Sequence, residues 1–419
     1  MKVTLLTYGS RGDVQPFLAL AVRLQQANHT PTLATPPRFA NLIQPFGVKF
    51  VPLAGDPDEL SRMFNQSGSN LFGMVRAMKQ HLFRIAPEVV RAARSAIRDA
   101  DILVHSFAFT TGAHSLAREL GIPDVSIQLF PMFAPTRAFA AVGAPQRMPG
   151  WLNWLSHWMF TQIFWHGGNL GYYQLRHHAP TDFPKRLYWA FTPQNGRVRT
   201  PLIFAISPAV LASPPEWNKP HIHTTGYFFL DEADYQPPDA LRRFLDAGAP
   251  PVCITFGSMV NRRAETLTRA ALKAIVRTGN RAIFLTGWGG WQPENPPEGA
   301  FFMEGAPHHW LLPRCKAILH HGGAGTTAAG LRAGIPAIIV PHTADQPFWG
   351  ARVAALGAGA VPIPIHHLDA ARVEHALHAI ESAQIRLRAA QLGEVIRRED
   401  GTGNAVAIIE THAVNNCLH

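Results

Sequence analysis

The sequence is poor in cysteine, in long apolar runs and in charge, and each shortage narrows what the chain can be. It has 3 cysteines in 419 residues, and Cys253, Cys315 and Cys417 show no paired spacing, which argues against a disulfide framework or a zinc site. No stretch reaches the roughly 18 to 20 consecutive apolar residues that a membrane-spanning helix needs. Charged residues make up 16% of the chain and hydrophobic residues 47%. This balance excludes a disordered chain and predicts a globular protein with a large core.

Positive charges outnumber negative ones, and the formal net charge is +10. Lys and Arg are scattered, and no basic run is interleaved with stacking aromatic residues, so nucleic acid is not the expected partner. An anionic nucleotide or an acidic membrane surface explains the surplus as well. The opening MKVTLLTYGSRGD is too short an apolar run for a signal peptide. With so few cysteines, we expect a cytoplasmic protein.

Strands and helices alternate along the chain, which predicts parallel sheets covered by helices on both faces. In the first half the expected strands are 2–7, 30–35, 49–53, 101–106 and 124–128; in the second half they are 252–256, 281–285, 301–304, 317–319 and 337–340. Prolines cluster between them, at 208–238, and predict a linker. The expected domains are therefore 1–207 and 239–419, two doubly wound α/β units joined by 208–238.

The stretch His320–Gly350 is the most informative part of the chain. A short apolar strand runs into two histidines, a Gly-Gly-Ala-Gly loop and an Ala-rich helix start. Backbone N–H groups at a helix N-terminus bind anions, so the loop predicts a phosphate site. A second strand then leads to Asp345 and Gln346, whose side chains can accept from and donate to the hydroxyls of a sugar ring. Together they describe the donor site of a nucleotide-sugar enzyme.

A competing interpretation is a dinucleotide site. Gly323–Ala328 matches the relaxed fingerprint G-x-G-x-x-A, and Asp345 lies about 20 residues beyond it. In a nicotinamide-binding unit, however, the acidic residue should close the second strand, whereas Asp345 comes four residues after Pro341. The histidine pair also has no role there.

These motifs resemble the signature of the family 1 glycosyltransferases, and their sequence is most similar to the sterol 3-beta-glucosyltransferase branch. The N-terminal GSRGDVQPFLALAVRL and the central FGSM and GWGG segments also look like that branch. The resemblance implies the two-domain GT-B architecture, with the domains facing across a cleft, and Asp345 and Gln346 as the sugar clamp. It assigns the diphosphate to His321, Gly323, Ala324, Gly325 and Thr326. It also implies that Ser258 contacts the donor phosphate and that Ala306 lies near the base and ribose. Gly305 occupies the position at which some members of the family stack a tryptophan on the uracil base.

Transfer from a nucleotide sugar requires a base for the acceptor hydroxyl, and Asp13 is the candidate. It lies on the predicted loop between the first strand and the first helix, at the carboxyl edge of the N-terminal sheet. The alternative is that Asp13 only caps the helix. The predicted helix N-terminus and His321 can stabilise the leaving diphosphate, and no Asp-x-Asp motif lies beside the phosphate loop. We therefore expect no metal and no cofactor, and the resemblance implies UDP-glucose as co-substrate.

Aromatic residues crowd the second part of the N-terminal half and predict an apolar acceptor pocket. The residues expected to line it are Phe107, Phe130, Phe133, Trp151, Trp154 and Trp158. The tryptophans share one helical face, which by itself is equally typical of a core. We expect a bulky hydrophobic alcohol such as a sterol, a terpenoid or a polyketide.

The sequence thus predicts an inverting, metal-independent glucosyltransferase. A nucleotide-sugar epimerase of the same build, a non-catalytic nucleotide- or lipid-binding protein and an NAD-dependent oxidoreductase remain as alternatives. An insoluble acceptor also suggests peripheral contact with the inner membrane face through the uncharged segment 148–175 and the basic stretch 76–98. The alternative is that both segments are internal walls of the domain.

Overall fold

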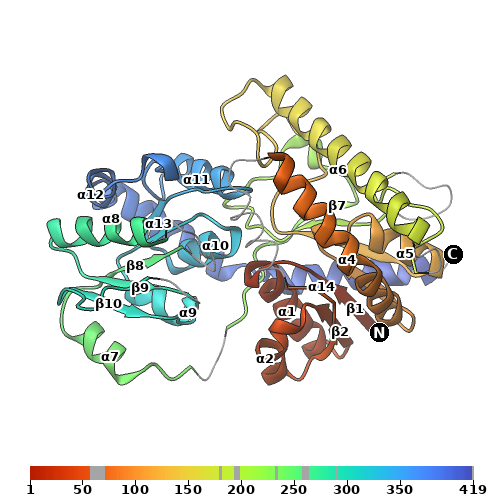
Figure 1. Ribbon diagram of the computed structural model, residues 1–419, viewed down its shortest axis with the longest axis horizontal. Helices are drawn as coiled ribbons and strands as arrows, with labels where there is room; N and C mark the ends of the chain where they lie inside the picture. Colours follow the sequence, from red (N-terminus) through yellow and green to blue (C-terminus); the bar gives the residue numbers. More distant parts are fainter. Residues whose placement is uncertain are drawn as a thin grey trace. The chain divides into compact units, whose positions relative to one another are not determined.

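The structure is a computed structural model that describes residues 1–56, 71–178, 182–192, 199–231, 235–256, 264–287 and 291–417, without the side chains of 71–82, 178, 264 and 417. The chain forms two compact units, shown in Figure 1. The first unit combines Met1–Leu230 with Asp400–His419, and the second is Asp231–Glu399.

The first unit is built on a seven-stranded sheet in the order β3-β2-β1-β4-β5-β6-β7, and all its strand pairs are parallel. The strands are β1 (Lys2–Leu6), β2 (Thr30–Thr35), β3 (Lys49–Pro52), β4 (Ile102–His105), β5 (Asp124–Gln128), β6 (Leu202–Phe204) and β7 (Ile222–Thr224). The five strands expected in this half are confirmed to within two residues. The short strands β6 and β7 were missed.

Helices cover both faces of this sheet because successive strand residues point to opposite sides. In β1, Val3 and Leu5 join a core that includes α1 and α14, whereas Leu6 joins a second core with α4 and α5. The helices of this unit are α1 (Arg11–Gln26), α2 (Ala40–Ile43), α4 (Leu71–Ile97), α5 (Gly112–Leu120), α6 (Gly150–His178) and α14 (Gly401–Cys417). The predicted doubly wound architecture is confirmed.

The second unit contains a five-stranded parallel sheet in the order β10-β9-β8-β11-β12. Its strands are β8 (Val252–Thr255), β9 (Ala282–Leu285), β10 (Ala300–Met303), β11 (Ala317–His320) and β12 (Ala337–Ile339). Its helices are α7 (Asp239–Asp246), α8 (Ala264–Arg277), α9 (His308–Leu311), α10 (Ala324–Ala333), α11 (Gln346–Ala355), α12 (Ala370–Ala379) and α13 (Ala383–Arg398). One core packs α8 and α12 against this sheet.

The boundary between the units differs from the expected one. The segment expected to be only a linker, 208–238, contains β7, and the first unit continues to Leu230. The C-terminal helix α14, expected in the second domain, packs on the first unit beside α1. Ala405 and Ile409 are buried in the first unit's core, and Arg23 pairs with Asp400 at 2.7 Å. These contacts make the predicted limit 239–419 wrong at its C-terminal end.

The strand orders place two sets of loops where parallel α/β sheets bind ligands. In each sheet the chain reverses its direction of winding once, between β1 and β4 in the first and between β8 and β11 in the second. Loops at the carboxyl ends of such strands splay apart and leave room for a ligand. The segment with Asp13 follows β1, and the segment with His321 follows β11.

Candidate functional site

Asp13 lies in the first turn of α1, and its carboxylate folds back on the loop after β1. Its Oδ2 accepts hydrogen bonds from the backbone N–H of Ser10 at 2.7 Å and from Ser10 Oγ at 2.9 Å. Burial raises the pKa of Asp13, and these two hydrogen bonds oppose the rise. The sequence predicted Asp13 on the loop before this helix, but α1 begins at Arg11 with Ser10 as its N-cap.

Asp13 therefore caps the helix, but the cap uses one of its two carboxylate oxygens. In the described part of the chain, Oδ1 makes no hydrogen bond. A raised pKa makes a carboxylate a stronger base, and an oxygen without a partner can accept a proton from a ligand hydroxyl. Capping and base catalysis are thus compatible at this residue.

The loops after β4 and β5 carry an aromatic cluster at the same edge of the sheet as the Asp13 loop. Phe107 lies 5.3 Å from Phe130 and 5.7 Å from Phe133 between ring centroids. Phe133 has φ of 67°, a backbone conformation that is strained for a bulky side chain and is typical of functional sites. The prediction that these three phenylalanines come together is confirmed. The sequence analysis missed three further members of the cluster, namely Phe164, Trp189 and Phe191.

The three tryptophans expected in the same pocket are not part of this ring cluster. Trp151, Trp154 and Trp158 share a face of α6, as predicted, but that face is 64%, 43% and 47% exposed at these positions. The buried face carries Asn153 and His157 instead, whose side chains donate to the backbone carbonyls of Arg137 and Phe139. The structure therefore does not bring these tryptophans together with the three phenylalanines, and their place in an acceptor pocket stays a prediction.

In the second unit, the loop between β11 and α10 is shaped for an anion. Gly323 is the N-cap of α10, and Ala324, Gly325 and Thr326 form its first turn, so their backbone N–H groups lack partners within the helix. Gly322 has φ of 92°, and its N–H donates to Nδ1 of the buried His320 at 3.1 Å. The loop singled out in the sequence therefore has the expected strand before it and the expected helix after it, and phosphate binding there stays a prediction.

The His321 side chain lies beside the N-terminus of α10. A Cβ atom on Gly323 would lie 2.6 Å from His321 Nε2, so the imidazole and the loop backbone are in close contact. Burial, helped by the neighbouring His342 and His308, lowers the pKa of His321 to about 4. The ring is neutral at pH 7 and carries no full charge, and its single N–H faces either the Thr255 backbone carbonyl or the helix N-terminus, according to the tautomer.

Asp345 and Gln346 follow β12, but their side chains are held differently. Asp345 is the N-cap of α11, and its Oδ2 accepts from Nε1 of the fully buried Trp349 at 2.8 Å. Gln346 is buried, and its Oε1 accepts from the backbone N–H groups of His342 and Thr343. Gln346 thus shapes the loop through its oxygen and has its amide NH₂ left as a donor for a ligand.

Two of the expected donor-site residues are less informative. Ala306 is half buried in the segment between β10 and α9. Ser258 lies outside the described residues.

Nowhere in the described ranges do three His, Cys, Asp or Glu side chains come together as metal ligands would. None of the described helices is both long enough and apolar enough to cross a bilayer.

Two family models match the chain. Residues 3–123 match the glycosyltransferase family 28 N-terminal domain, and residues 294–399 match the C-terminal domain described as erythromycin biosynthesis protein CIII-like. The chain is also similar to curated proteins along nearly its whole length. Two sterol 3-beta-glucosyltransferases of Arabidopsis thaliana are 34% and 33% identical over 98% of this chain, which spans 66% and 68% of them. One from Yarrowia lipolytica is 35% identical over 98% of this chain, which spans only 28% of that protein.

Solved structures share the fold at low sequence identity. The calicheamicin glycosyltransferase CalG4 matches with a TM-score of 0.69 and 20% identity, covering 98% of both chains. The kitacinnamycin glycotransferase matches with a TM-score of 0.70 and 17% identity, covering 98% of this chain and 99% of that one. A Streptomyces glycosyltransferase complexed with thymidine diphosphate matches with a TM-score of 0.63 and 18% identity, over 98% of this chain and 99% of that one. The expected GT-B fold of two parallel-sheet α/β units is confirmed.

Proposed function

Because the chain belongs to the sterol 3-beta-glucosyltransferase family, we propose that it is an inverting glycosyltransferase that moves glucose from UDP-glucose to a hydroxyl of a bulky hydrophobic alcohol. The chain spans 66% of one plant relative and 28% of the Yarrowia lipolytica relative, so the proposal concerns the part that these proteins share. The observation that carries it is the pairing of an anion site with a hydroxyl clamp at one edge of the second sheet.

The donor's diphosphate would lie at the N-terminus of α10. Ala324, Gly325 and Thr326 present backbone N–H groups there, and the helix dipole adds about half a positive charge. His321 contributes a neutral N–H donor beside them. These groups stabilise the negative charge that grows on the diphosphate as it leaves, and we propose that they do so without a metal ion. Asp345 and the amide NH₂ of Gln346 would bind the hydroxyls of the sugar.

Asp13 would act as the base. Its free Oδ1 accepts the proton of the acceptor hydroxyl as the hydroxyl oxygen attacks the anomeric carbon. The new carbon–oxygen bond forms as the bond from the anomeric carbon to the diphosphate oxygen breaks, and that electron pair leaves with UDP. A single displacement from an α-linked donor gives a β-glucoside. Neither step needs an oxidant or a second co-substrate.

The acceptor would bind against the aromatic cluster of the first unit. Phe107, Phe130 and Phe133 belong to loops at the same sheet edge as Asp13. Ring faces and edges without polar groups suit a rigid apolar alcohol, which needs a hydrogen-bond partner only at its hydroxyl. This division assigns the acceptor to the first unit and the donor to the second.

We also propose that α6 rests on a membrane. The helix has its polar side inward, since Asn153 is 6% and His157 2% exposed while Trp151 is 64% exposed. Met159, Ile163, Leu170 and Tyr173 extend the exposed apolar face, and residues 148–175 include no charged side chain. Exposed tryptophans on an uncharged helix face fit the boundary between lipid headgroups and acyl chains. A nearly insoluble acceptor could then be taken directly from the bilayer.

The basic stretch of α4 contributes less to this contact than its sequence suggested. Arg91 pairs with Asp182 at 3.2 Å and Arg94 with Glu119 at 3.1 Å. The side chains of Arg76 and Lys79 lie outside the described residues. Paired arginines attract anionic lipid weakly, so apolar contact by α6 should outweigh charge in this proposal.

A donor screen tests the proposal. The protein is incubated with UDP-, TDP- and GDP-sugars and with a sterol or a macrolide as acceptor, and the products are identified by mass spectrometry. We expect a hexoside of the sterol from UDP-glucose. An altered nucleotide sugar formed without an acceptor would indicate the epimerase, and tight NADH binding in calorimetry would indicate the oxidoreductase.

A further inference from the structure

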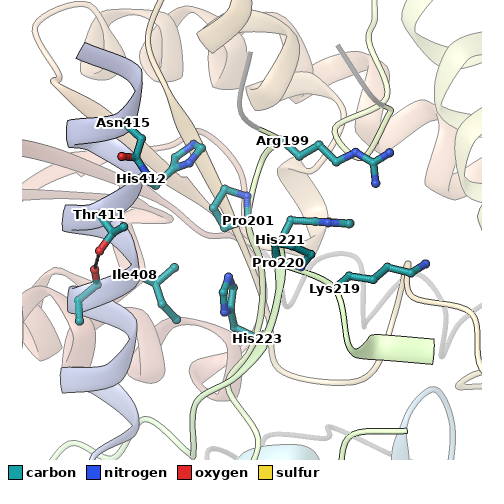
Figure 2. A pocket seen from close by; sticks show the side chains of 11 residues that line it. Arg199, Pro201, Lys219, Pro220, His221, His223, Ile408, Thr411, His412 and Asn415 are labelled. Atoms are coloured by element: carbon teal, nitrogen blue, oxygen red, sulfur yellow. Dashed lines mark hydrogen bonds between the residues drawn. The ribbon is translucent and has the colours of Figure 1, made fainter. Parts of the chain in front are cut away.

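The first unit contains a hollow that lies away from the loops described above. Its volume is about 650 Å³, and three segments wall it: the residues leading into β6, the residues around the start of β7, and the second half of α14. Figure 2 shows Arg199, His221 and Lys219 extending in the same direction on one side, with His412 of α14 on the other.

This hollow lies at the amino ends of the strands, whereas the proposed active site lies at their carboxyl ends. Arg199 precedes β6 and Lys219 precedes β7, so both belong to the amino ends of their strands. The loops with Asp13 and Phe107 follow strands and belong to the carboxyl edge. All strands of this sheet are parallel, so the two edges lie on opposite sides of the sheet and a ligand in the hollow is neither donor nor acceptor.

Positive charge gathers in this hollow without a counter-charge. Of the residues that the structure describes, the groups that line it and can carry charge are Arg199, Lys219, His221, His223 and His412, and none of these described lining residues is a carboxylate. Among the described residues, Arg199 and Lys219 form no side-chain hydrogen bond and no ion pair. Arg199, Lys219 and His221 line the same hollow, and burial and then the charges of Arg199 and Lys219 lower the pKa of His221. Unpaired cations held together in this way repel one another and leave room for an anion.

The nearby carboxylates are already engaged elsewhere. Asp124, at the start of β5, lies next to His412 and is bound by His105 and His114, each at 2.9 Å. Glu410 on α14 pairs with His29 at 2.8 Å. Neither is therefore available to neutralise Arg199 and Lys219. Burial also lowers the pKa values of His223 and His412, and each ring interacts with a backbone carbonyl, that of Pro220 or that of Asp124. Both rings are therefore mostly neutral near pH 7, and each gains a second N–H for an anion only when it takes up a proton.

We propose that this hollow is a binding site for a phosphate group, with Arg199 and Lys219 as its charged ligands and His221 and His223 as its further donors. Arg binds phosphate through two parallel N–H donors and Lys binds it as a point charge. The hollow is larger than one phosphate, and Pro201, Pro220 and Ile408 give it apolar walls. Its ligand should therefore be a phosphate attached to a less polar group, from a soluble metabolite or from a lipid headgroup.

Calorimetry with pyrophosphate as the probe tests this site in the full-length protein. Saturating UDP is added first, so that the proposed donor site cannot take the probe. We expect one binding event in the wild type and at least about tenfold weaker binding in Arg199→Gln/Lys219→Gln, because two charge-assisted contacts are lost. Glycosyl transfer should stay unchanged in this variant, since neither residue belongs to the proposed catalytic machinery.

The matched control is Lys49→Gln/Arg98→Gln, which removes the same charge. Lys49 begins β3 and Arg98 follows α4, so both lie at the amino edge of the same sheet, and both are exposed. The control should bind pyrophosphate as the wild type does. Absence of pyrophosphate binding to the wild type, or equal losses in the two double variants, would overturn the proposal even if glycosyl transfer is confirmed.

The source of the phosphate is decided by competition. Short-chain phosphatidic acid and glycerol phosphate are each titrated against bound pyrophosphate. Displacement by phosphatidic acid alone assigns the site to lipid headgroups, and displacement by both assigns it to soluble phosphate esters as well. If neither compound displaces pyrophosphate, the assignment to phosphate esters is overturned.

Discussion

Gly9 and Asp13 are in such close contact that a Cβ atom on Gly9 would lie 2.3 Å from Asp13 Oδ2. Gly9 has φ of 146°, a conformation that other residues rarely adopt. Because Gly9 has no side chain, the Asp13 carboxylate can fold back on Ser10. The two hydrogen bonds from Ser10 to Asp13 Oδ2 then fix the direction of Asp13 Oδ1. The loop after β1 is built around the position of this one carboxylate.

Asp13→Asn should lower kcat by about 10² to 10⁴ with little change in donor affinity, because the amide keeps the volume and the acceptor oxygen of the cap but is not a base. Burial raises the pKa of Asp13, so wild-type activity should fall with decreasing pH at values above the usual pKa of an aspartate. The variant should lose this acidic limb. Near wild-type turnover in Asp13→Asn would show that another group is the base.

Gly9→Ala should inactivate the enzyme nearly as strongly as Asp13→Asn, since the added methyl group would displace the carboxylate. Gly12→Ala is the control on the same loop, because its Cβ would meet only Ser10 Oγ at 3.5 Å, an ordinary contact. Steady-state kinetics and thermal unfolding of both variants separate positioning from stability. Equal kcat values for Gly9→Ala and Gly12→Ala would show that the position of the carboxylate does not matter.

Asp345→Asn should weaken UDP-glucose binding about tenfold and leave UDP binding almost unchanged. The substitution keeps an acceptor for Trp349 Nε1 but alters the contact with the sugar hydroxyls. Asp369→Asn is the control, since Asp369 is also a helix N-cap of this unit. Calorimetry with both nucleotides provides the comparison. Equal losses for UDP and UDP-glucose in Asp345→Asn would favour a ribose contact, as in a dinucleotide fold.

Trp151→Gln/Trp158→Gln should reduce co-sedimentation with lipid vesicles and barely change stability, by about 0.5 kcal/mol or less per substitution, because both rings are exposed. Since Arg91 and Arg94 are paired, binding should depend only weakly on salt. Wild-type vesicle binding by the variant would exclude α6 as the contact. A large loss of stability would mean that the tryptophans contribute to packing.

The sequence was most reliable for the loops that are predicted to bind donor groups, because their turns depend on local chemistry. Gly322 and Gly323 mark the turn from strand to helix, and a parallel sheet places such turns at its carboxyl edge. The phosphate loop therefore followed from residue order alone. Asp345 and Gln346 were placed correctly after β12, but they form the start of α11, and the use of Gln346 Oε1 by two backbone N–H groups could not be inferred from residue order.

Predictions that depended on tertiary packing were less successful. The spacing of Trp151, Trp154 and Trp158 correctly predicts a shared helix face, but periodicity does not say which face is buried. Here Asn153 and His157 find backbone partners inside, which leaves the apolar face outside. The return of α14 to the first unit depends on contacts between residues hundreds of positions apart, such as Arg23 with Asp400. Such pairings leave no local signal in the sequence.

The central claim is glucose transfer with inversion to a lipophilic hydroxyl. The most direct test is to incubate the protein with UDP-glucose and a detergent-solubilised sterol, in the presence of EDTA, and to quantify UDP and the sterol product while assigning the anomeric configuration by NMR. We predict equal amounts of UDP and sterol β-glucoside, formed at least about 100-fold more slowly by Asp13→Asn. An α-glucoside, a reaction that stops with EDTA, or UDP release without any glucoside would contradict the account.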